Sequence, residues 1–555
     1  MTATYNENNP VALNKTIRLT GGYPDCSLSS QPSGRSTLQR QGDGLVLDIL
    51  YAATVDAPTR QVAVENFVIT GGGGSGSLTG GAIVEGRPGR LIVDFRNVEF
   101  SNNSSASNGG GLRISTTGDR SGTSTFVTLD NDTIFSQNNA AGDGGGIYCQ
   151  SNHDNGLGTL LRLGTTLVIN NQADNGGGIA LNGCTQTFIY AGGPIVLFIP
   201  TGGIVLNTAA SNGGGLFMEN GARAVLSSGE FQEFGDAAEA ALVAGNTAGG
   251  AGGGVSIFGE DVSLTMLDAY VINNTADAWG GGASVDLGAE MDIERPTLAG
   301  ACESPVSAGL VLRRPPCSVF EGNEATTGGA LSVRGNSRLW VSRTSLRNNT
   351  ISGTLGAAAS IANSSLYTGP PTEFRMEGSV VHENTGGYLF SLQQNAAAEI
   401  SFSTIVDNPV TLAVLGAFSG GRTDLDIRSS IVVSNTWIIE GNDDGNLSST
   451  IDCVIGNKPF GDTGASNSFA YSNIDPQFIN QAENNYQLQQ TSPAIDYCSD
   501  FYPPEFPDLD GNQRGVTWAG PAPDPAPNPG NGDYDLGAFE AQPDRIFNDR
   551  FETTP

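Results

Sequence analysis

Apolar and polar residues alternate with a period of two along most of the chain. Clear examples are LRI at 112–114, IYC at 147–149, TFVTLD at 125–130 and SLTML at 263–267. This period, combined with many Thr, Val and Ile residues, predicts short β-strands. No segment keeps a helical period over three turns, and the Ala-rich segment 233–245 comes closest to one.

A run of glycines recurs after an Asn-rich turn, and an apolar residue stands three positions before each Asn. The segments with both features are 103–114, 138–149, 170–181, 207–218, 246–257, 274–285 and 323–333. The apolar-x-x-Asn motif occurs eleven times up to Asn435, at separations of 24 to 49 residues. Such a unit cannot bury its apolar face alone, whereas stacked units can. We therefore predict an all-β fold, a right-handed parallel β-helix of about eleven coils, with loop insertions and a C-terminal capping module.

The recurring asparagines are expected to stack inside a turn of successive coils. Asn tolerates the left-handed backbone region, and its amide can bond to its neighbours. The predicted ladder consists of Asn103, Asn138, Asn170, Asn207, Asn246, Asn274 and Asn323. The glycine run would supply positive φ angles where the coils crowd together.

These paired motifs resemble the repeats of chlamydial polymorphic outer-membrane proteins, which carry FxxN and GGA[ILV] on a β-helical passenger. The nearest copy here is FEGN at 320–323 followed by GGAL at 328–331, and FSNN at 100–103 and FSQN at 135–138 also match. The resemblance covers about residues 67–435. It implies a β-helix outside the bacterial cell or on its outer surface.

After Asn435 the pattern changes, and SPAID at 492–496, DLDGNQR at 508–514 and DYDLGAFE at 533–540 follow in that order. They resemble the choice-of-anchor Q module at the C-terminus of bacterial β-helix proteins, which implies secretion or surface attachment. We expect N-terminal coils in 1–66, whose true start lies upstream and whose signal peptide is missing from this chain. The repeat region is 67–435, the C-terminal coils and module are 436–540, and a tail is 541–555.

A partial calcium loop is one interpretation of the alternating oxygen ligands Asp508, Asp510 and Asn512. The remaining positions of an EF-hand are missing. The alternative is structural, with Arg514 paired to Asp535 or Glu540 so that the last coil stays closed. The structural interpretation requires no cofactor. In the other interpretation, the spacing of the oxygen ligands allows calcium as a cofactor.

The chain has seven cysteines, and we predict two disulfides, Cys302 with Cys317 and Cys453 with Cys498. Two pairs in a chain with so little Cys favour an oxidising compartment. Cys149 alternates in phase with core residues and is expected to be a buried thiol. Cys184 has no evident partner. The only histidines, His153 and His382, are expected at the surface.

The alternation after the glycine run also predicts outward-facing columns of side chains. The candidate ligand-binding residues on these columns are Tyr148, Gln150, Asn182, Phe217, Glu219, Phe258 and Asp286. Exposed aromatic rings beside amide and acid groups suit sugar binding, and the alternative is that a loop covers them. Glu219 and Asp286 lie two coils apart, roughly 10 Å by strand spacing. That is long for a hydrolytic pair, and we assign no catalytic residue.

The charge balance restricts the partners. There are 57 acidic and 26 basic residues, which gives a net charge of −31. Nucleic acid needs a basic footprint, so we expect no binding to it. The same field disfavours anionic membranes and long polyanions unless a divalent cation bridges them. No transmembrane span is expected, because the longest charge-free stretch, 188–206, contains two Pro and four Gly.

We therefore expect a monomeric, secreted or surface-attached bacterial protein with a structural or adhesive role, whose partner is a polysaccharide or a cell-surface protein of a host. The alternative is a polysaccharide lyase, dependent on calcium, or another carbohydrate-active enzyme on the same scaffold. Three or more carboxylates beside an Arg on one outer face would favour the enzyme. The sequence suggests a scattered face instead.

Overall fold

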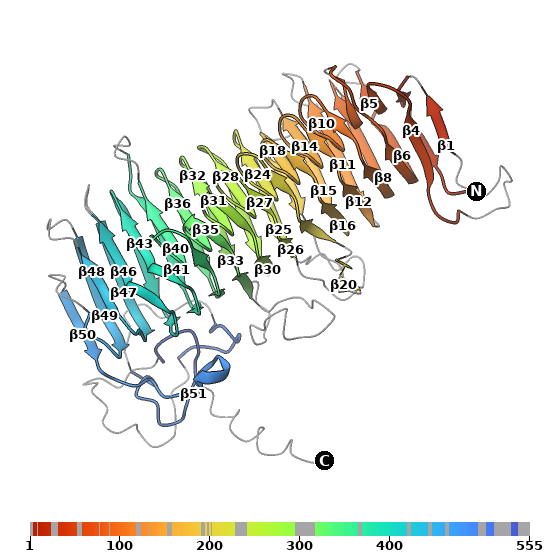
Figure 1. Ribbon diagram of the computed structural model, residues 1–555. Helices are drawn as coiled ribbons and strands as arrows, with labels where there is room; N and C mark the ends of the chain where they lie inside the picture. Colours follow the sequence, from red (N-terminus) through yellow and green to blue (C-terminus); the bar gives the residue numbers. More distant parts are fainter. Residues whose placement is uncertain are drawn as a thin grey trace, which may run out of the picture. The chain divides into compact units, whose positions relative to one another are not determined.

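Strands make up most of the part of the chain that the structure, a computed structural model, describes (Figure 1). This part comprises residues 4–7, 9–23, 32–52, 58–76, 78–87, 89–117, 124–130, 132–151, 158–189, 195–196, 199–200, 202–227, 241–294, 317–363, 369–418, 423–441, 447–460, 466–497, 507–515 and 534–541. It forms two compact units, the first up to residue 291 with 323–325, and the second from 292 onward apart from those three residues.

In the first unit the strands form three parallel sheets. The first sheet contains β1 (Thr4–Glu7), β3 (Ile17–Thr20), β4 (Ser36–Arg40), β6 (Arg60–Thr70), β8 (Arg90–Ser101), β11 (Ser124–Asp130), β12 (Thr133–Ser136), β15 (Thr159–Leu163), β16 (Thr166–Ile169), β19 (Gln186–Ile189), β22 (Gly203–Val205), β25 (Arg223–Ser227), β26 (Ala241–Ala244), β29 (Ser263–Leu267) and β30 (Ala269–Ile272). The second contains β2 (Val11–Ala12), β5 (Leu45–Tyr51), β7 (Gly80–Gly86), β10 (Leu112–Thr116), β14 (Ile147–Ser151), β18 (Ile179–Asn182), β24 (Leu216–Glu219), β28 (Val255–Phe258) and β32 (Ala283–Asp286).

The third sheet of this unit consists of short strands, β9 (Ser104–Ser105), β13 (Asn139–Ala140), β17 (Gln172–Ala173), β23 (Thr208–Ala209), β27 (Thr247–Ala248) and β31 (Thr275–Trp279). A separate antiparallel pair is β20 (Ile195–Val196) with β21 (Ile199–Pro200). The strands β33 (Glu290–Glu294) and β35 (Glu324–Thr327) contain residues of both units. Residues 241–244 of the Ala-rich segment are strand β26, and residues 233–240 lie outside the described part.

The second unit repeats the same coil architecture. Its first sheet contains β34 (Ser318–Glu321), β37 (Arg338–Ser342), β38 (Thr344–Arg347), β41 (Thr372–Glu377), β42 (Val380–His382), β44 (Ala396–Ser401), β45 (Thr404–Ile405), β47 (Thr423–Val432), β49 (Leu447–Gly456) and β50 (Ser466–Ser472). Its second contains β36 (Leu331–Arg334), β40 (Ala359–Ala362), β43 (Gly386–Gln393), β46 (Val410–Phe418) and β48 (Trp437–Gly441). The short strand β39 (Thr350–Ile351), the antiparallel pair β51 (Phe478–Asn480) and β52 (Asn485–Leu488), and the 3-10 helix η2 (Gln481–Glu483) complete the unit.

Successive coils place equivalent residues in register, and this confirms the predicted parallel β-helix. The inward column that follows the glycine run is Leu112, Ile147, Ile179, Leu216, Val255 and Ala283. All six side chains are fully buried. On the first sheet, the rings of Phe100 and Phe135 stack with centroids 4.6 Å apart. Apolar columns of this kind supply the core that one coil could not form alone.

The asparagine ladder is present, with one residue of the prediction wrong. Asn171, and not Asn170, is the ladder residue, because Asn171 is buried while Asn170 is exposed with φ 54°. In the first unit each ladder Nδ2 donates to the Oδ1 of the next Asn at 2.9 or 3.0 Å, through Asn103, Asn138, Asn171, Asn207, Asn246, Asn274 and Asn323. A further ladder joins Asn349, Asn384 and Asn408 in the second unit.

The glycine run is required by the close stacking of the coils. Gly144, the first of its run, has φ 71°. A Cβ added at Gly145 would overlap the carbonyl oxygens of Gln172 and Gly177 in the following coil. A side chain at these positions would therefore force adjacent coils apart.

The disulfides differ from the prediction. Cys149 is not a free thiol, because it forms a disulfide with Cys184. Cys317 and Cys453 are also disulfide-bonded. Their predicted partners, Cys302 and Cys498, lie outside the described residues, so those two pairings stay predictions.

His382 is buried, and the expectation that it lies at the surface is wrong. Its ring lies 5.3 Å from that of Tyr486, and its Nδ1 lies 3.2 Å from Oε2 of Glu383. Burial, with the neighbouring Arg347 guanidinium, lowers the pKa of His382 to about 3. His382, two residues before the ladder residue Asn384, therefore has a neutral imidazole near pH 7. His153 lies outside the described residues.

Candidate functional site

The predicted ligand-binding columns are in register, but two of their aromatic rings are covered. Tyr148, Ala180 and Phe217 occupy equivalent positions on β14, β18 and β24. Tyr148 is 3% exposed and Phe217 is 5% exposed, and the two form a buried cluster with Ala180. They are therefore not the exposed platform that we predicted. Alternation carries no information on what covers a side chain.

The second predicted column brings polar groups together. Asn182 Nδ2 donates to Glu219 Oε1 at 2.5 Å. Burial, with the nearby carboxylate of Asp143, raises the pKa of Glu219. Phe258 pairs in register with Glu219 and is 40% exposed, and Gln150 pairs with Asn182.

Asp286 lies at the far end of the same column. It pairs in register with Phe258, and its Oδ1 accepts the backbone N–H of Leu287 at 2.8 Å. Phe258 therefore lies between Glu219 and Asp286 along the column. This column offers an amide and a carboxylate with one exposed ring.

The proposed calcium ligands lie in a hydrogen-bonded turn. Both carboxylate oxygens of Asp508 are engaged, by the backbone N–H of Asn512 at 2.6 Å, its side-chain amide at 2.9 Å and the N–H of Glu540 at 2.9 Å. Asp510 accepts Nε2 of Gln487 at 2.5 Å. These contacts satisfy the carboxylates from within the chain, and calcium binding stays a prediction.

Arg514 lies buried beside this turn, as the structural alternative expected. Its guanidinium lies 3.8 Å from Oε2 of Glu540 and 4.9 Å from the ring centroid of Phe402. Burial lowers the pKa of Arg514, and the carboxylates of Glu540, Asp508 and Asp535 act in the opposite direction. Because Phe402 directly follows β44, Arg514 packs the C-terminal turn against the coil that contains β44.

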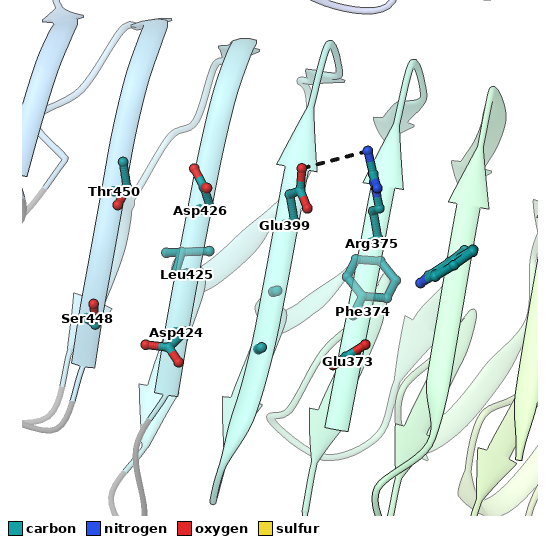
Figure 2. A pocket seen from close by; sticks show the side chains of 12 residues that line it. Glu373, Phe374, Arg375, Glu399, Asp424, Leu425, Asp426, Ser448 and Thr450 are labelled. Atoms are coloured by element: carbon teal, nitrogen blue, oxygen red, sulfur yellow. Dashed lines mark ion pairs between the residues drawn. The ribbon is translucent and has the colours of Figure 1, made fainter. Parts of the chain in front are cut away.

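A groove on the first sheet of the second unit was not predicted. It crosses β37, β41, β44, β47 and β49 and has a volume of about 420 Å³. Figure 2 shows its side chains standing on successive strands. One outward column is Trp340, Arg375, Glu399, Asp426 and Thr450, and the next is Arg338, Glu373, Ala397, Asp424 and Ser448. This face, defined by these ten residues, is called the groove face below.

Ion pairs connect the charged side chains of the groove face. Arg375 lies 3.9 Å from Glu399 and 3.3 Å from Glu377, and Arg338 lies 3.3 Å from Glu373. Burial is the main cause that raises the pKa of Glu377, which stands beside the groove. The face therefore combines guanidinium groups with carboxylates that form ion pairs with them.

Trp340 supplies the aromatic surface of this groove. Trp340 is 47% exposed and lies at one end of the groove. The small side chains of Ala397 and Ala398 also line it. A large exposed ring beside charged hydrogen-bonding groups is typical of a ligand site. The polar positions at spacing two in RLWVS, TEFRME, AAAEIS and TDLDIRS were the available signal.

The interpretation that charges are scattered over the outer faces is wrong for this face. Glu373, Glu399, Asp424 and Asp426 all line the groove with Arg375. They are separated by up to 53 residues in sequence and meet only because the strands are in register. These strands do not follow directly after the glycine runs, so the repeat motifs alone could not align them.

A smaller cavity of about 230 Å³ lies beside His382. It is lined by Arg347, His382, Tyr486 and Asp510, among others. Arg347 donates to Glu321 at 3.0 Å. The cavity lies between coil strands and the C-terminal turns of the same unit.

Comparison with known families supports the repeat assignment. The family model of the Chlamydia polymorphic membrane protein repeat matches residues 97–115 and 132–150. These segments contain FSNN with GGGL and FSQN with GGGI, which confirms the resemblance at two copies, while the copy at 320–331 lies outside them. No curated protein matches the chain. The choice-of-anchor Q resemblance stays a prediction.

The matched repeats and the parallel β-helix indicate a surface or structural β-helix protein. The polymorphic membrane proteins that give the repeat its name belong to the bacterial outer surface, which suggests a surface location. Within the described residues, no helix is long and apolar enough to cross a membrane.

Proposed function

We propose that this chain is a surface-attached or secreted bacterial β-helix protein with an adhesive role, and that the groove face binds carbohydrate. The observation that carries the proposal is Trp340, whose ring is exposed at one end of a groove lined by paired charges. An indole ring can stack on the apolar face of a pyranose. The carboxylates and guanidinium groups beside it can hydrogen-bond the ring hydroxyls and fix their orientation.

The disulfide supports a location outside the reducing cytoplasm. Cys149 and Cys184 are both fully buried and joined to each other. Disulfides persist in secreted and surface proteins and are rare in the cytosol. The three C-terminal motifs at 492–496, 508–514 and 533–540 support attachment to the surface through a choice-of-anchor Q-like module.

The test is binding to a panel of immobilised polysaccharides, with Trp340→Ala as the groove variant. Its matched control is Trp437→Ala, which removes a tryptophan that is 59% exposed on β48 of the second sheet. We expect Trp340→Ala to weaken binding about tenfold or more, and Trp437→Ala to leave it unchanged. Equal loss in both variants, or no bound polysaccharide at all, would contradict the proposal. Binding only to a host cell-surface protein would redirect it to a protein partner.

A carbohydrate-active enzyme is the second candidate, and the four carboxylates that line the groove beside Arg375 favour it. Glu377, with its raised pKa, and Glu399 both pair with Arg375, so two carboxylates of different environment share one guanidinium. Glycosidases use such an acid and a neighbouring carboxylate. The same incubations, with calcium and with EDTA, would reveal an enzyme as newly formed chain ends that Glu377→Gln abolishes. We expect no new chain ends, because the side chain of Glu399 is 41% exposed and well solvated.

A further inference from the structure

The outward positions of the five groove strands carry an excess of negative charge. Their carboxylates are Glu373, Glu377, Glu399, Asp424, Asp426 and Asp452. Their guanidinium groups are Arg338, Arg375 and Arg428. The outer face of these strands is therefore three charges more negative than positive. This local excess has the same sign as the net charge of −31 on the whole chain.

The cations of this face are already engaged. Arg428 Nε donates to Asp426 Oδ1 at 2.8 Å, Arg375 pairs with Glu377 and Glu399, and Arg338 pairs with Glu373. An anionic ligand would have to compete with these carboxylates for each guanidinium. A ligand with cationic groups would instead be attracted by the excess of carboxylates on this face.

The small side chain of Ala397 leaves a notch on the groove face where a cationic group of the ligand can lie. Ala397 stands in register between Glu373 on β41 and Asp424 on β47, and Glu399 is the next outward residue on its own strand. The methyl group fills little of the space between these longer neighbours. A cation above Ala397 would lie about one strand spacing, roughly 5 Å, from Glu373 and Asp424 on the flanking strands. An ammonium has three donors and no acceptor, which matches a site bordered by carboxylates.

Trp340 lies two strands away from this notch, on β37. A ligand that contacts both must therefore be longer than one sugar ring. Extended glycan chains have a repeat close to the spacing between coils, so one ring can stack on Trp340 while a later ring lies above Ala397. Figure 2 shows Arg375, Phe374 and Glu373 on β41, the strand between those of Trp340 and Ala397, so a ligand that spans both points would pass these side chains.

From this geometry we infer that the glycan bound by the groove face is an amino-sugar polymer with free, protonated amino groups. This inference rests on the proposed function and narrows its substrate class. The groove would discriminate against uronic-acid polymers, because the carboxylates of the groove face would repel the carboxylates of the polymer. It would also bind N-acetylated chains more weakly, because acetylation removes the positive charge while keeping the sugar ring.

The experiment compares partly deacetylated and fully N-acetylated oligomers of glucosamine with a neutral glucose oligomer, by calorimetry at pH 6. We expect the amine-bearing oligomer to bind about tenfold more tightly than its acetylated counterpart, and this advantage to shrink as salt is raised. Asp424→Asn and Glu399→Gln should each reduce the advantage severalfold. Glu260→Gln, which neutralises an exposed carboxylate of the first unit, should not.

The outcomes separate this inference from the proposed function. Equal binding of acetylated and amine-bearing oligomers, both weakened by Trp340→Ala, would overturn the amino-sugar inference and leave carbohydrate binding intact. Binding of no oligomer would overturn both. Tight binding of polylysine that Trp340→Ala does not weaken would show a general cation surface and would also overturn the amino-sugar assignment. Circular dichroism of each variant establishes that the β-helix is retained.

Discussion

At the scale of single residues, the ladder asparagines join neighbouring coils through buried hydrogen bonds. Asn171 Oδ1 accepts both the backbone N–H and the side-chain amide of Asn138, at 3.0 and 2.9 Å. Its Nδ2 donates to the carbonyl of Phe135 and to Asn207 Oδ1, both at 3.0 Å. All the capacity of one buried amide is used, so its position in the coil is fixed.

Replacing Asn171 by Ala should therefore be costly. The variant leaves buried partners on Asn138, Phe135 and Asn207 without their hydrogen bonds. We expect a loss of about 3 kcal/mol or more in the free energy of unfolding, measured by denaturant titration. The matched control is Asn170→Gly, at the adjacent exposed position with φ 54°. Because Gly accepts this backbone region freely, the control should change stability by less than about 1 kcal/mol. Similar losses in both variants would contradict the ladder.

His382 predicts a specific dependence on pH. Its pKa of about 3 in the folded state lies below the usual 6.5, so the unfolded chain takes up the proton first. The stability that the neutral imidazole contributes is complete above pH 6.5 and is lost as the pH falls toward 3, at up to about 1.4 kcal/mol per pH unit.

The measurement for His382 is proton NMR of the two imidazole rings, with His153→Gln to identify the signal. We expect no titration of His382 between pH 5 and pH 8 while the chain stays folded. A titration midpoint near 6.5 in the folded protein would mean that the ring is solvated. Burial and the neighbouring guanidinium of Arg347 set this environment, and Glu383 and Tyr486 also contact the ring.

At the scale of strands, the disulfide joins two neighbouring coils. Cys149 lies on β14 and Cys184 follows β18, and these strands pair directly, although the two residues are 35 positions apart. The bond closes one full turn of the first unit. It therefore limits how far these two coils can separate in the unfolded chain.

Removing this disulfide should destabilise the first unit. The double variant Cys149→Ser, Cys184→Ser should lose about 2–4 kcal/mol of stability, as is usual when a native disulfide is removed. Denaturant titration followed by a probe in the first unit measures the loss. In the unmodified native protein, a thiol reagent should label neither cysteine. Labelling of both under native conditions would show that the pair is not formed.

The same strands show what the sequence could and could not predict. The second-sheet strands follow the glycine runs at a constant distance, so their registers and both outward columns were predicted. Glu373, Asp424 and Ser448 come from first-sheet strands with variable loops between them, and no motif sets their alignment. In the pair Asn170 and Asn171, either residue fits the motif, and only burial distinguishes them. The cover over Tyr148 depends on packing, which alternation does not encode.

At the scale of the whole molecule, charge is the property that acts on every partner. Only two of the 26 basic residues are Lys, and acidic residues exceed basic ones by 31. Many of the arginines that the structure describes pair with carboxylates, as Arg18 does with Glu65 and Arg35 with Glu99. The long-range field is therefore negative, and it slows the approach of polyanions before any specific contact forms.

This field predicts that the protein does not bind polyanions. Neither heparin nor double-stranded DNA columns should retain it at about 0.15 M salt, where charges more than about 8 Å apart are largely screened. Lowering the salt should not bring about retention, since it lengthens the range of a repulsive interaction. The same run with calcium tests whether a divalent cation can bridge the carboxylates to a polyanion. Retention without calcium that weakens as salt is raised would require a basic surface. Such a result would contradict the negative field. Both the exclusion of nucleic acid and the preference for a cationic glycan follow from that field.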